Sequence, residues 1–150
     1  RLLVFGDGPS LIYMQGLVRE MCIVDKVIFF GRYSNKQLRF IYDVTDLVWA
    51  AYPTTDYNTR YAISNKYFEC SLFSKVPIVS AGTMMSKYRD KDSSMISVDE
   101  CSVDDIVDKL AKYDISQEFK KYEKDSFWEC HEFKLFEAFD NILLQRGDQK

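Results

Sequence analysis

The segment from residue 60 to residue 82 contains the side chains best suited to chemistry. Ser64, Asn65 and Lys66 open a stretch whose later apolar spacing predicts a helix. The first turn of a helix offers unpaired N–H groups and a partial positive charge, which suit a phosphate, and Ser and Lys side chains add further donors. An ordinary N-cap followed by a solvated lysine accounts for the same residues, and position alone does not decide between the two interpretations.

Glu69 is the carboxylate of this segment. It follows Lys66 by three residues and Asn65 by four, so it shares their face of the predicted helix. A carboxylate at this place can accept two hydrogen bonds, for instance from the vicinal hydroxyl groups of a ribose. An ion pair between Glu69 and Lys66 is the alternative, and local spacing does not choose between the two.

A second candidate is Gly31-Arg32-Tyr33, which follows an apolar run directly. Gly31 would let the backbone approach a ligand closely, and Arg32 could meet an anion. A plain turn with an exposed arginine is the alternative. Another apolar run leads into Gly6-Asp7-Gly8-Pro9, which lacks the third glycine of a dinucleotide-binding motif and is interpreted as a tight turn.

These candidates need elements that hold them in place, and the sequence alternates short apolar runs with helical patterns. The runs predict strands at residues 2–5, 27–30, 47–51, 78–80 and 95–98. The helical patterns cover residues 10–22 and 34–43, the stretch after Ser64, a helix capped by Ser102, and a helix from Ser126 to near Gly147. The alternation predicts an α/β fold: a Rossmann-like parallel sheet flanked by helices, with a long C-terminal helix.

Ligands of such a sheet bind beyond the carboxyl ends of its strands. Four connections therefore form the expected site, at residues 6–9, 31–34, 53–65 and 80–83. Within them, residues 53–59 are expected to be a polar loop. A charged loop is expected at residues 86–94.

The bulk properties exclude several classes of protein. A length of 150 residues fits a single compact domain over residues 1–150. The net charge of −3 argues against broad binding of nucleic acid, which needs a basic surface. No apolar run approaches the roughly 20 residues of a membrane-spanning helix, so no transmembrane segment is expected. The aromatic share of 15% indicates a heavy core or, alternatively, a surface that meets a partner.

The cysteines and the single histidine do not indicate a metal site. Cys22, Cys70, Cys101 and Cys130 are widely spaced among apolar residues, and no C-x-x-C pair occurs. They are interpreted as reduced core thiols of a cytosolic protein. His131 is interpreted as structural, so neither a metal nor a cofactor is expected.

Three blocks of the sequence together resemble a known family. In chain order they are LLVFGDGP, VDKVIFFGRYSNKQLRFIYDVTDLVWAAYP and SNKYFECSLFSKVPIVS. They are similar to successive blocks of the C-terminal domain of GT-B glycosyltransferases, in particular the large family 4 of retaining, nucleotide-sugar-dependent enzymes. The tail Asp125-Ser126-Phe127-Trp128 is similar to the element that precedes the C-terminal helix of that family.

The resemblance implies a donor-binding domain for a nucleoside diphosphate sugar. It implies that the carboxylate matching Glu69 holds the ribose, that the helix start at 64–66 faces the diphosphate and sugar, and that the backbone at 31–33 lies beside the base. Tyr61 stands where many members have a second glutamate, which concerns recognition of the transferred sugar. The resemblance assigns no catalytic protein nucleophile and requires no metal.

The same resemblance sets the expected function. Because the chain enters an apolar run directly after Arg1, it is expected to be a piece of a longer enzyme, without the first strand and the N-terminal acceptor domain. The parent enzyme would transfer a sugar, with retention, to a glycan or lipid-linked acceptor in surface polysaccharide biosynthesis. It would act in the cytoplasm, or peripherally at the inner face of the membrane through the missing domain.

Two other functions remain open. A non-catalytic GT-B-like module that binds a partner is favoured by the aromatic content and by Tyr61. A sugar-nucleotide epimerase of the same fold would need additional carboxylates and histidines, which the sequence does not offer.

Overall fold

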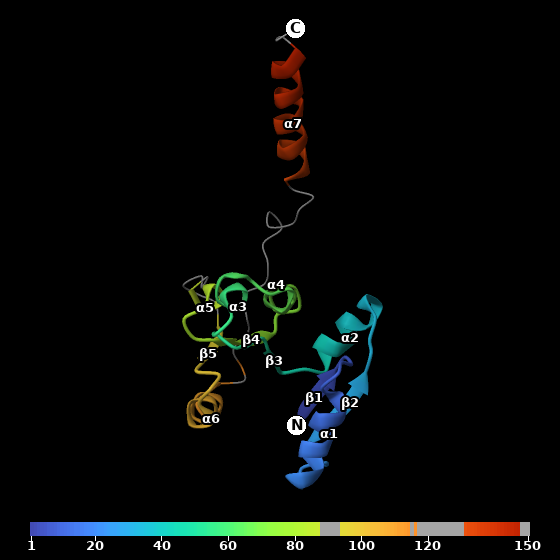
Figure 1. The fold of residues 1–150 in the computed structure, drawn as a ribbon, viewed down its shortest axis with the longest axis vertical. Coiled ribbons are helices and arrows are strands. Elements are labelled where there is room, and N and C mark those ends of the chain that lie inside the picture. Colours follow the sequence, from blue (N-terminus) through green and yellow to red (C-terminus); the bar gives the residue numbers. More distant parts are fainter. Residues whose placement is uncertain (88–93, 115, 117–130, 148–150) are drawn as a thin grey trace.

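The structure is a computed structural model, and it describes residues 1–87, 94–114, 116 and 131–147. Its strands are all parallel, and helices flank them, so the α/β class predicted from the sequence is confirmed. Figure 1 shows how the elements follow one another from the N-terminal strands to the last helix. The fold is compatible with a Rossmann-like arrangement, in which ligands lie beyond the carboxyl ends of the strands.

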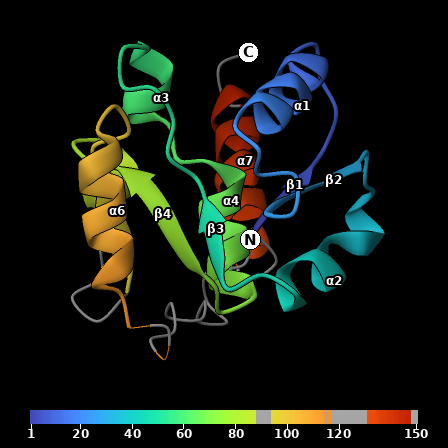
Figure 2. The same cartoon turned by 90° about the horizontal axis from the view of Figure 1, so that it is seen from below.

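The strands form two sheets rather than the single sheet predicted. β1 (Leu2–Phe5) pairs with β2 (Val27–Gly31), and a second sheet has the order β3 (Leu47–Trp49), β4 (Val76–Ser80), β5 (Ile96–Val98). Both views place β3 on the side of its sheet that is nearer to β1 (Figures 1 and 2). The two sheets are separate because no ladder of hydrogen bonds joins the described edges of β1 and β3.

The helices begin where short polar side chains cap them. Ser34, Ser64 and Ser102 occupy the N-caps of their helices, as predicted. The helical elements are α1 (Leu11–Glu20), the 3₁₀ helix η1 (Asn35–Gln37), α2 (Leu38–Asp43), α3 (Tyr57–Tyr61), α4 (Asn65–Leu72), α5 (Met84–Lys87), α6 (Val103–Ala111) and α7 (Glu132–Gly147).

The polar loop predicted at residues 53–59 is wrong in its second half, where α3 begins. Asp56 is the N-cap, and its carboxylate accepts hydrogen bonds from the backbone N–H of Asn58 at 2.6 Å and of Thr59 at 3.4 Å. Asp is one of the preferred N-cap residues, so the sequence carries a start signal for α3 at Asp56. The loop expected at 86–94 is likewise shortened by α5, and residues 88–93 lie outside the described residues.

Four strand boundaries also differ from the prediction, two of them by one residue, at the end of β2 and the start of β5. β4 begins at Val76 rather than Ile78, so Pro77 lies within a strand. The pairing of β4 with β5 starts only at Ile78, so the missing N–H of Pro77 does not interrupt that ladder. β3 ends at Trp49 rather than at residue 51.

The hydrophobic core lies around β4. Every residue of β4 is buried, and α4, α5, β3 and β5 supply its neighbours. β1, α1 and β2 contain no buried residue. The buried hydrophobic residues of the core are Tyr42, Ala50, Ala51, Tyr67, Cys70, Val76, Ile78, Val79, Met85, Ile96 and Val98.

Two expectations about burial are corrected, and two further predictions lie outside the described residues. Among the described aromatic residues only Tyr42 and Tyr67 are buried, so the aromatic content does not make a heavy core. Cys70 is a core thiol, whereas Cys22 and Cys101 are exposed. Cys130 and the capping box predicted at residues 126–129 lie outside the described residues.

α7 lies apart from the other elements in Figure 1. The sequence places apolar residues on one side of this helix. Its described large apolar side chains are exposed: Phe133, Leu135, Phe136 and Phe139.

Candidate functional site

The start of α4 lies at the carboxyl end of β3. The hydroxyl oxygen of Ser64 accepts a hydrogen bond from the backbone N–H of Lys66 at 3.2 Å and lies 3.3 Å from the Tyr52 hydroxyl. The ammonium of Lys66 donates to the carbonyl oxygen of Trp49, the last residue of β3, at 3.3 Å. It also lies 5.6 Å from the centroid of the Tyr52 ring. The Lys66 charge is thereby held over the strand end, while Asn65 is exposed beside it.

Glu69 is held by a residue that the sequence did not single out. The Tyr42 hydroxyl donates a hydrogen bond of 2.6 Å to Oε2 of Glu69. The Tyr42 ring stacks on Phe73 with a centroid distance of 4.7 Å, which fixes the direction of its hydroxyl. Among the described ion pairs, the predicted alternative between Glu69 and Lys66 does not occur. One carboxylate oxygen of Glu69 therefore has a donor, and the other has no described partner.

Burial raises the pKa values of two side chains beside Glu69, those of Tyr42 and Cys70. Burial first, and then the hydrogen bond to Glu69, hold the pKa of Tyr42 far above its ordinary range, with a smaller effect from nearby Tyr33. Burial and the charge of Glu69 raise the pKa of Cys70 to about 12. Tyr42 is therefore a permanent donor at neutral pH, and Cys70 is a protonated, unreactive thiol.

The Gly31-Arg32-Tyr33 turn lies between the ends of β1 and β2. Gly31 has φ +73°, a left-handed conformation that favours glycine, and its carbonyl oxygen accepts the N–H of Gly6 at 2.7 Å. The guanidinium of Arg32 is 2.8 Å from the Asp7 carboxylate, in an exposed ion pair. The predicted anion-binding side chain thus already has a carboxylate partner. Tyr33 packs edge-on against Phe5 at 6.3 Å.

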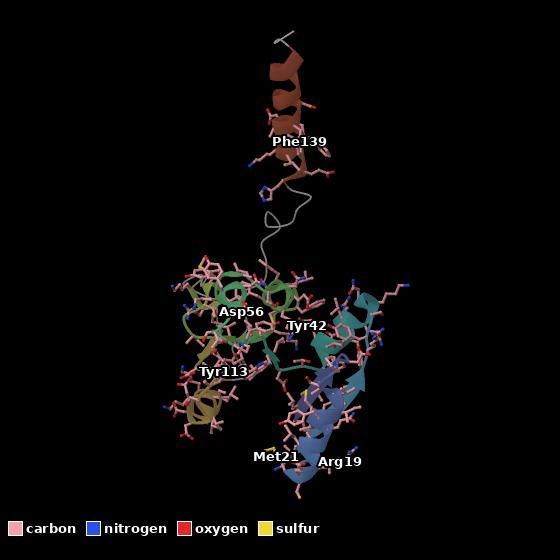
Figure 3. The ribbon with its side chains drawn as sticks, viewed as in Figure 1. Arg19, Met21, Tyr42, Asp56, Tyr113 and Phe139 are labelled. Carbon is pink, nitrogen blue, oxygen red and sulfur yellow. The ribbon has the colours of Figure 1, made fainter. Side chains whose placement is uncertain are left out.

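Tyr61 lines a pocket of about 280 Å³ at the carboxyl end of the larger sheet. The pocket lies among α3, α5 and the connections after β3 and β4, and its lining residues are Thr54, Arg60, Tyr61, Ala81, Gly82, Met84 and Lys87. None of residues 31–33, 64–66 or 69 lines it. Figure 3 labels Asp56 at the start of α3 and Tyr42 where α2 approaches α4.

The predicted residues therefore fall into three groups. Ser64, Asn65 and Lys66 share the start of α4, with Glu69 on the same helix. Gly31, Arg32 and Tyr33 belong to the turn after β2. Tyr61 belongs to the pocket.

The loops after β3, β4 and β5 are tied together by residues that sequence reasoning missed. The Ser80 hydroxyl donates to the carbonyl oxygen of Tyr52 at 2.6 Å and accepts the N–H of Tyr52 at 2.9 Å. The N–H and hydroxyl of Thr54 both donate to Oε1 of Glu100 at 2.8 Å. Slight burial acts to raise the pKa of Glu100, but the hydrogen bonds from Thr54 outweigh it and lower that pKa. Glu100 follows β5, so the strand-end rule could have found it.

Other kinds of site find no support among the described residues. No group of three or more His, Cys, Asp or Glu side chains in the described ranges is placed to hold a metal ion. No helix in this part of the chain is both long and apolar enough to cross a bilayer. His131 is exposed and directly precedes α7. No protein-family model, curated protein or solved structure matches the chain.

Proposed function

We propose that this chain is the donor-binding domain of a GT-B type glycosyltransferase that uses a nucleoside diphosphate sugar. The parent enzyme would transfer the sugar to a glycan or lipid-linked acceptor that another domain binds. The three sequence blocks described above support this proposal, and the parallel α/β fold is compatible with it. The observation that carries it is the start of α4, where a capped helix end and a held lysine meet at the carboxyl end of β3.

The diphosphate would bind at this helix start. The partial positive charge at the start of α4 and the Lys66 ammonium together attract phosphate oxygens, while the N–H groups of Lys66 and Tyr67 already donate to Ser64. Charge that develops on the leaving diphosphate would be stabilised by the same groups, which are in place before the reaction. Binding would require Lys66 to exchange its contact with the Trp49 carbonyl oxygen for the phosphate.

The ribose would bind at Glu69. Tyr42 occupies Oε2 and orients the carboxylate, and Oε1 has no described partner. Two adjacent ribose hydroxyl groups can donate to a single carboxylate. The pKa of Tyr42 is raised, so its hydroxyl keeps its proton and continues to orient Glu69 throughout the neutral pH range.

Calorimetric titration of this chain with UDP, GDP and ADP tests the proposal. We expect one of them to bind with a dissociation constant between micromolar and millimolar, and the other two more weakly. Glu69→Gln should weaken that nucleotide by about tenfold, because a charged acceptor contributes about 1.5–3 kcal/mol to a hydrogen bond. The side-chain oxygen of Gln can still accept the hydrogen bond from the Tyr42 hydroxyl, so the fold should be kept. Glu20→Gln on α1 is the matched control.

The 2′,3′-dideoxy form of the binding nucleotide separates ribose recognition from a structural effect, because it lacks both hydroxyl donors. If Glu69 holds the ribose, the dideoxy nucleotide should bind the wild type and Glu69→Gln with similar affinity. Lys66→Ala should weaken inorganic pyrophosphate, whereas Glu69→Gln should not. Absence of binding by all three nucleotides to the folded chain would refute the proposed function.

A partner-binding module is the second candidate, and one observation favours it. Large apolar side chains are exposed along the N-terminal elements, in particular Ile12, Tyr13, Met21, Val24 and Phe40. Exposed apolar surface of this kind marks interaction sites in folded proteins. Under this function, Glu69→Ala would leave the activity of the full-length protein unchanged, whereas donor binding predicts a large loss.

A further inference from the structure

The pocket beside Tyr61 has a charge that the proposed donor site does not explain. Its two charged lining residues are Arg60, near the end of α3, and Lys87, at the end of α5. Both are basic, and none of the described residues that line the pocket is acidic. The whole chain carries a net charge of −3, so this local excess of positive charge runs against the overall balance.

Neither cation is neutralised by a described neighbour. The described ion pairs join Arg32 to Asp7, Lys109 to Asp105 and Lys112 to Asp108, and none involves Arg60 or Lys87. Two described acids belong to the elements that form the pocket, and both carboxylates already accept hydrogen bonds. Asp56 caps α3 through the N–H groups of Asn58 and Thr59, and Glu100 accepts two hydrogen bonds from Thr54. Two basic side chains around one small pocket repel each other unless an anion lies between them.

The walls of the pocket are well placed to receive a ligand. Thr54 is anchored through Glu100 to the end of β5, and Ala81 donates its N–H to the carbonyl oxygen of Val98 at 2.7 Å. Gly82 has φ +75° and no heavy atom within 4 Å of where a Cβ would lie, so its backbone is open to an approaching group. The rear of the pocket is therefore fixed, while the two long basic side chains can adjust.

The size of the pocket limits what it can hold. Its volume of about 280 Å³ lies just below the range of drug-sized ligand pockets, which span roughly 300–1,000 Å³. This volume suits one monosaccharide ring and not a whole nucleotide sugar. The diphosphate already has a place at the start of α4 under the proposed function, so the pocket would receive the sugar.

We propose that this pocket binds the transferred sugar and that Arg60 and Lys87 select a sugar bearing a carboxylate, that is, a uronic acid. This inference rests on the proposed function, because it takes the pocket as the sugar part of the donor site. A guanidinium binds a planar carboxylate through two parallel hydrogen bonds, and an ammonium adds a point charge. Tyr61 would cover one face of the ring, as aromatic side chains do with apolar sugar faces.

Calorimetry with matched donors tests the selection. UDP, UDP-glucose and UDP-glucuronate, or their counterparts with whichever base binds, share the nucleotide and differ in the sugar. We expect the glucuronate donor to bind about tenfold more tightly than the glucose donor at low ionic strength. The preference should shrink as salt is raised, because exposed charges are screened.

Variants of the two cations assign the preference to the pocket. Arg60→Gln and Lys87→Gln should each lower the glucuronate preference several-fold and leave the glucose donor unchanged. Arg19→Gln is the matched control, because Arg19 lies on α1, away from Asp56 at the start of α3 (Figure 3). Free glucuronate should also bind the wild type more tightly than free glucose does, and this difference should be lost in Arg60→Gln.

The possible failures can be told apart. If the nucleotide binds but both sugar donors bind alike, the uronate inference is overturned and the proposed function stands. If Arg60→Gln weakens UDP and both donors equally, the cations hold the diphosphate, which also overturns the inference. If no nucleotide binds but free glucuronate binds through Arg60 and Lys87, the proposed function fails and the carboxylate pocket stands.

Discussion

The β1–β2 sheet and strand β4 are built from similarly apolar residues in different surroundings. β1 has the sequence LLVF and β4 the sequence VPIVS. All residues of β4 are buried, because it pairs with strands on both sides and packs against α4 and α5. β1 and β2 pair only with each other, and none of their residues is buried.

The difference shows that an apolar run predicts a strand more securely than it predicts the cover of that strand. A two-stranded sheet has an unpaired edge on each strand and is marginally stable by itself. Phe30 and Leu2 are exposed, so part of the apolar surface of β1 and β2 is not covered by the described residues. The stability of the chain should therefore reside in the β3–β4–β5 region.

The largest predicted effect compares two methionines, one in each region. Met85 is 1% exposed against β4, whereas Met21 is 65% exposed after α1. Met85→Ala should lower the free energy of unfolding by about 2–4 kcal/mol, because it removes buried methylene groups and leaves a cavity. Met21→Ala should change it by less than about 0.5 kcal/mol, as for other surface substitutions.

Urea denaturation followed by circular dichroism measures both changes. Equal losses in the two variants would contradict the comparison, since they would mean that the N-terminal unit is covered in solution. Repeating the Met21→Ala measurement at several protein concentrations would then identify self-association, because only an intermolecular contact makes the loss depend on concentration.

The next effect concerns the contact between the two regions. Tyr42 belongs to α2 but lies in the core, where it stacks on Phe73 and donates to Glu69. Tyr42→Phe keeps the stacked ring and removes a hydrogen bond to a carboxylate, so it should cost about 1–2 kcal/mol. Tyr13→Phe on exposed α1 is the control and should cost almost nothing. A Tyr42→Phe variant as stable as the wild type would mean that water replaces the hydroxyl at Glu69.

Most helices and strands could be predicted from local sequence patterns, because neighbouring residues largely determine where these elements form. Ser64 and Ser102 capped helices as predicted, since a cap needs only a short side chain and the next turn of backbone. The parallel arrangement also followed from the alternation of strands and helices. The split into two sheets could not be predicted in this way, because whether β1 and β3 pair depends on residues far apart in the sequence, and they do not pair.

The candidate site was predicted less well than the fold for a related reason. Glu69 was singled out from helical spacing, but its partner Tyr42 lies 27 residues earlier and joins it only through tertiary packing. The pairing of Arg32 with Asp7 likewise depends on how β1 and β2 lie side by side. The cations of the pocket, Arg60 and Lys87, stand on two short helices, of which α3 begins inside a predicted loop.

A smaller effect should appear at high pH, where the buried thiol of Cys70 should behave differently from the exposed thiol of Cys101. Burial, and then the charge of Glu69, raise the pKa of Cys70 from 9.0 to about 12. Above pH 9 the unfolded chain therefore loses this proton while the folded chain keeps it, so stability is full below pH 9 and falls toward pH 12. At pH 10 the loss from this thiol should be about 1 kcal/mol.

Denaturation of Cys70→Ala between pH 8 and pH 10.5 checks the sign. This variant should be less stable at pH 8, because a buried side chain is shortened, but its stability should decline less steeply than that of the wild type. Cys101→Ala, which removes an exposed thiol, should follow the wild-type slope. A parallel decline in all three proteins would show that Cys70 ionises as freely in the folded chain as in the unfolded one.

The smallest effect compares the two carboxylates that tie neighbouring strand ends together. Asp7 meets Arg32 in an exposed ion pair between the ends of β1 and β2, and such pairs contribute about 0.2–1 kcal/mol. Glu100 accepts two hydrogen bonds from Thr54 within the packed region, and its pKa is lowered. The contribution of Glu100 is therefore present above its unfolded pKa near 4.5 and is lost as the pH falls through the lower folded value. Glu100→Gln should cost about 0.5 kcal/mol at pH 7 and should lose less stability than the wild type between pH 5 and pH 3, because Gln does not titrate.

The loss of stability caused by Asp7→Asn should disappear in 0.5 M NaCl, because salt screens an exposed ion pair. The loss caused by Glu100→Gln should remain, because salt leaves the Thr54 hydrogen bonds intact. If salt abolished both effects alike, the Glu100 contact would be as exposed as that of Asp7, and the contrast between the two regions would not extend to their strand ends.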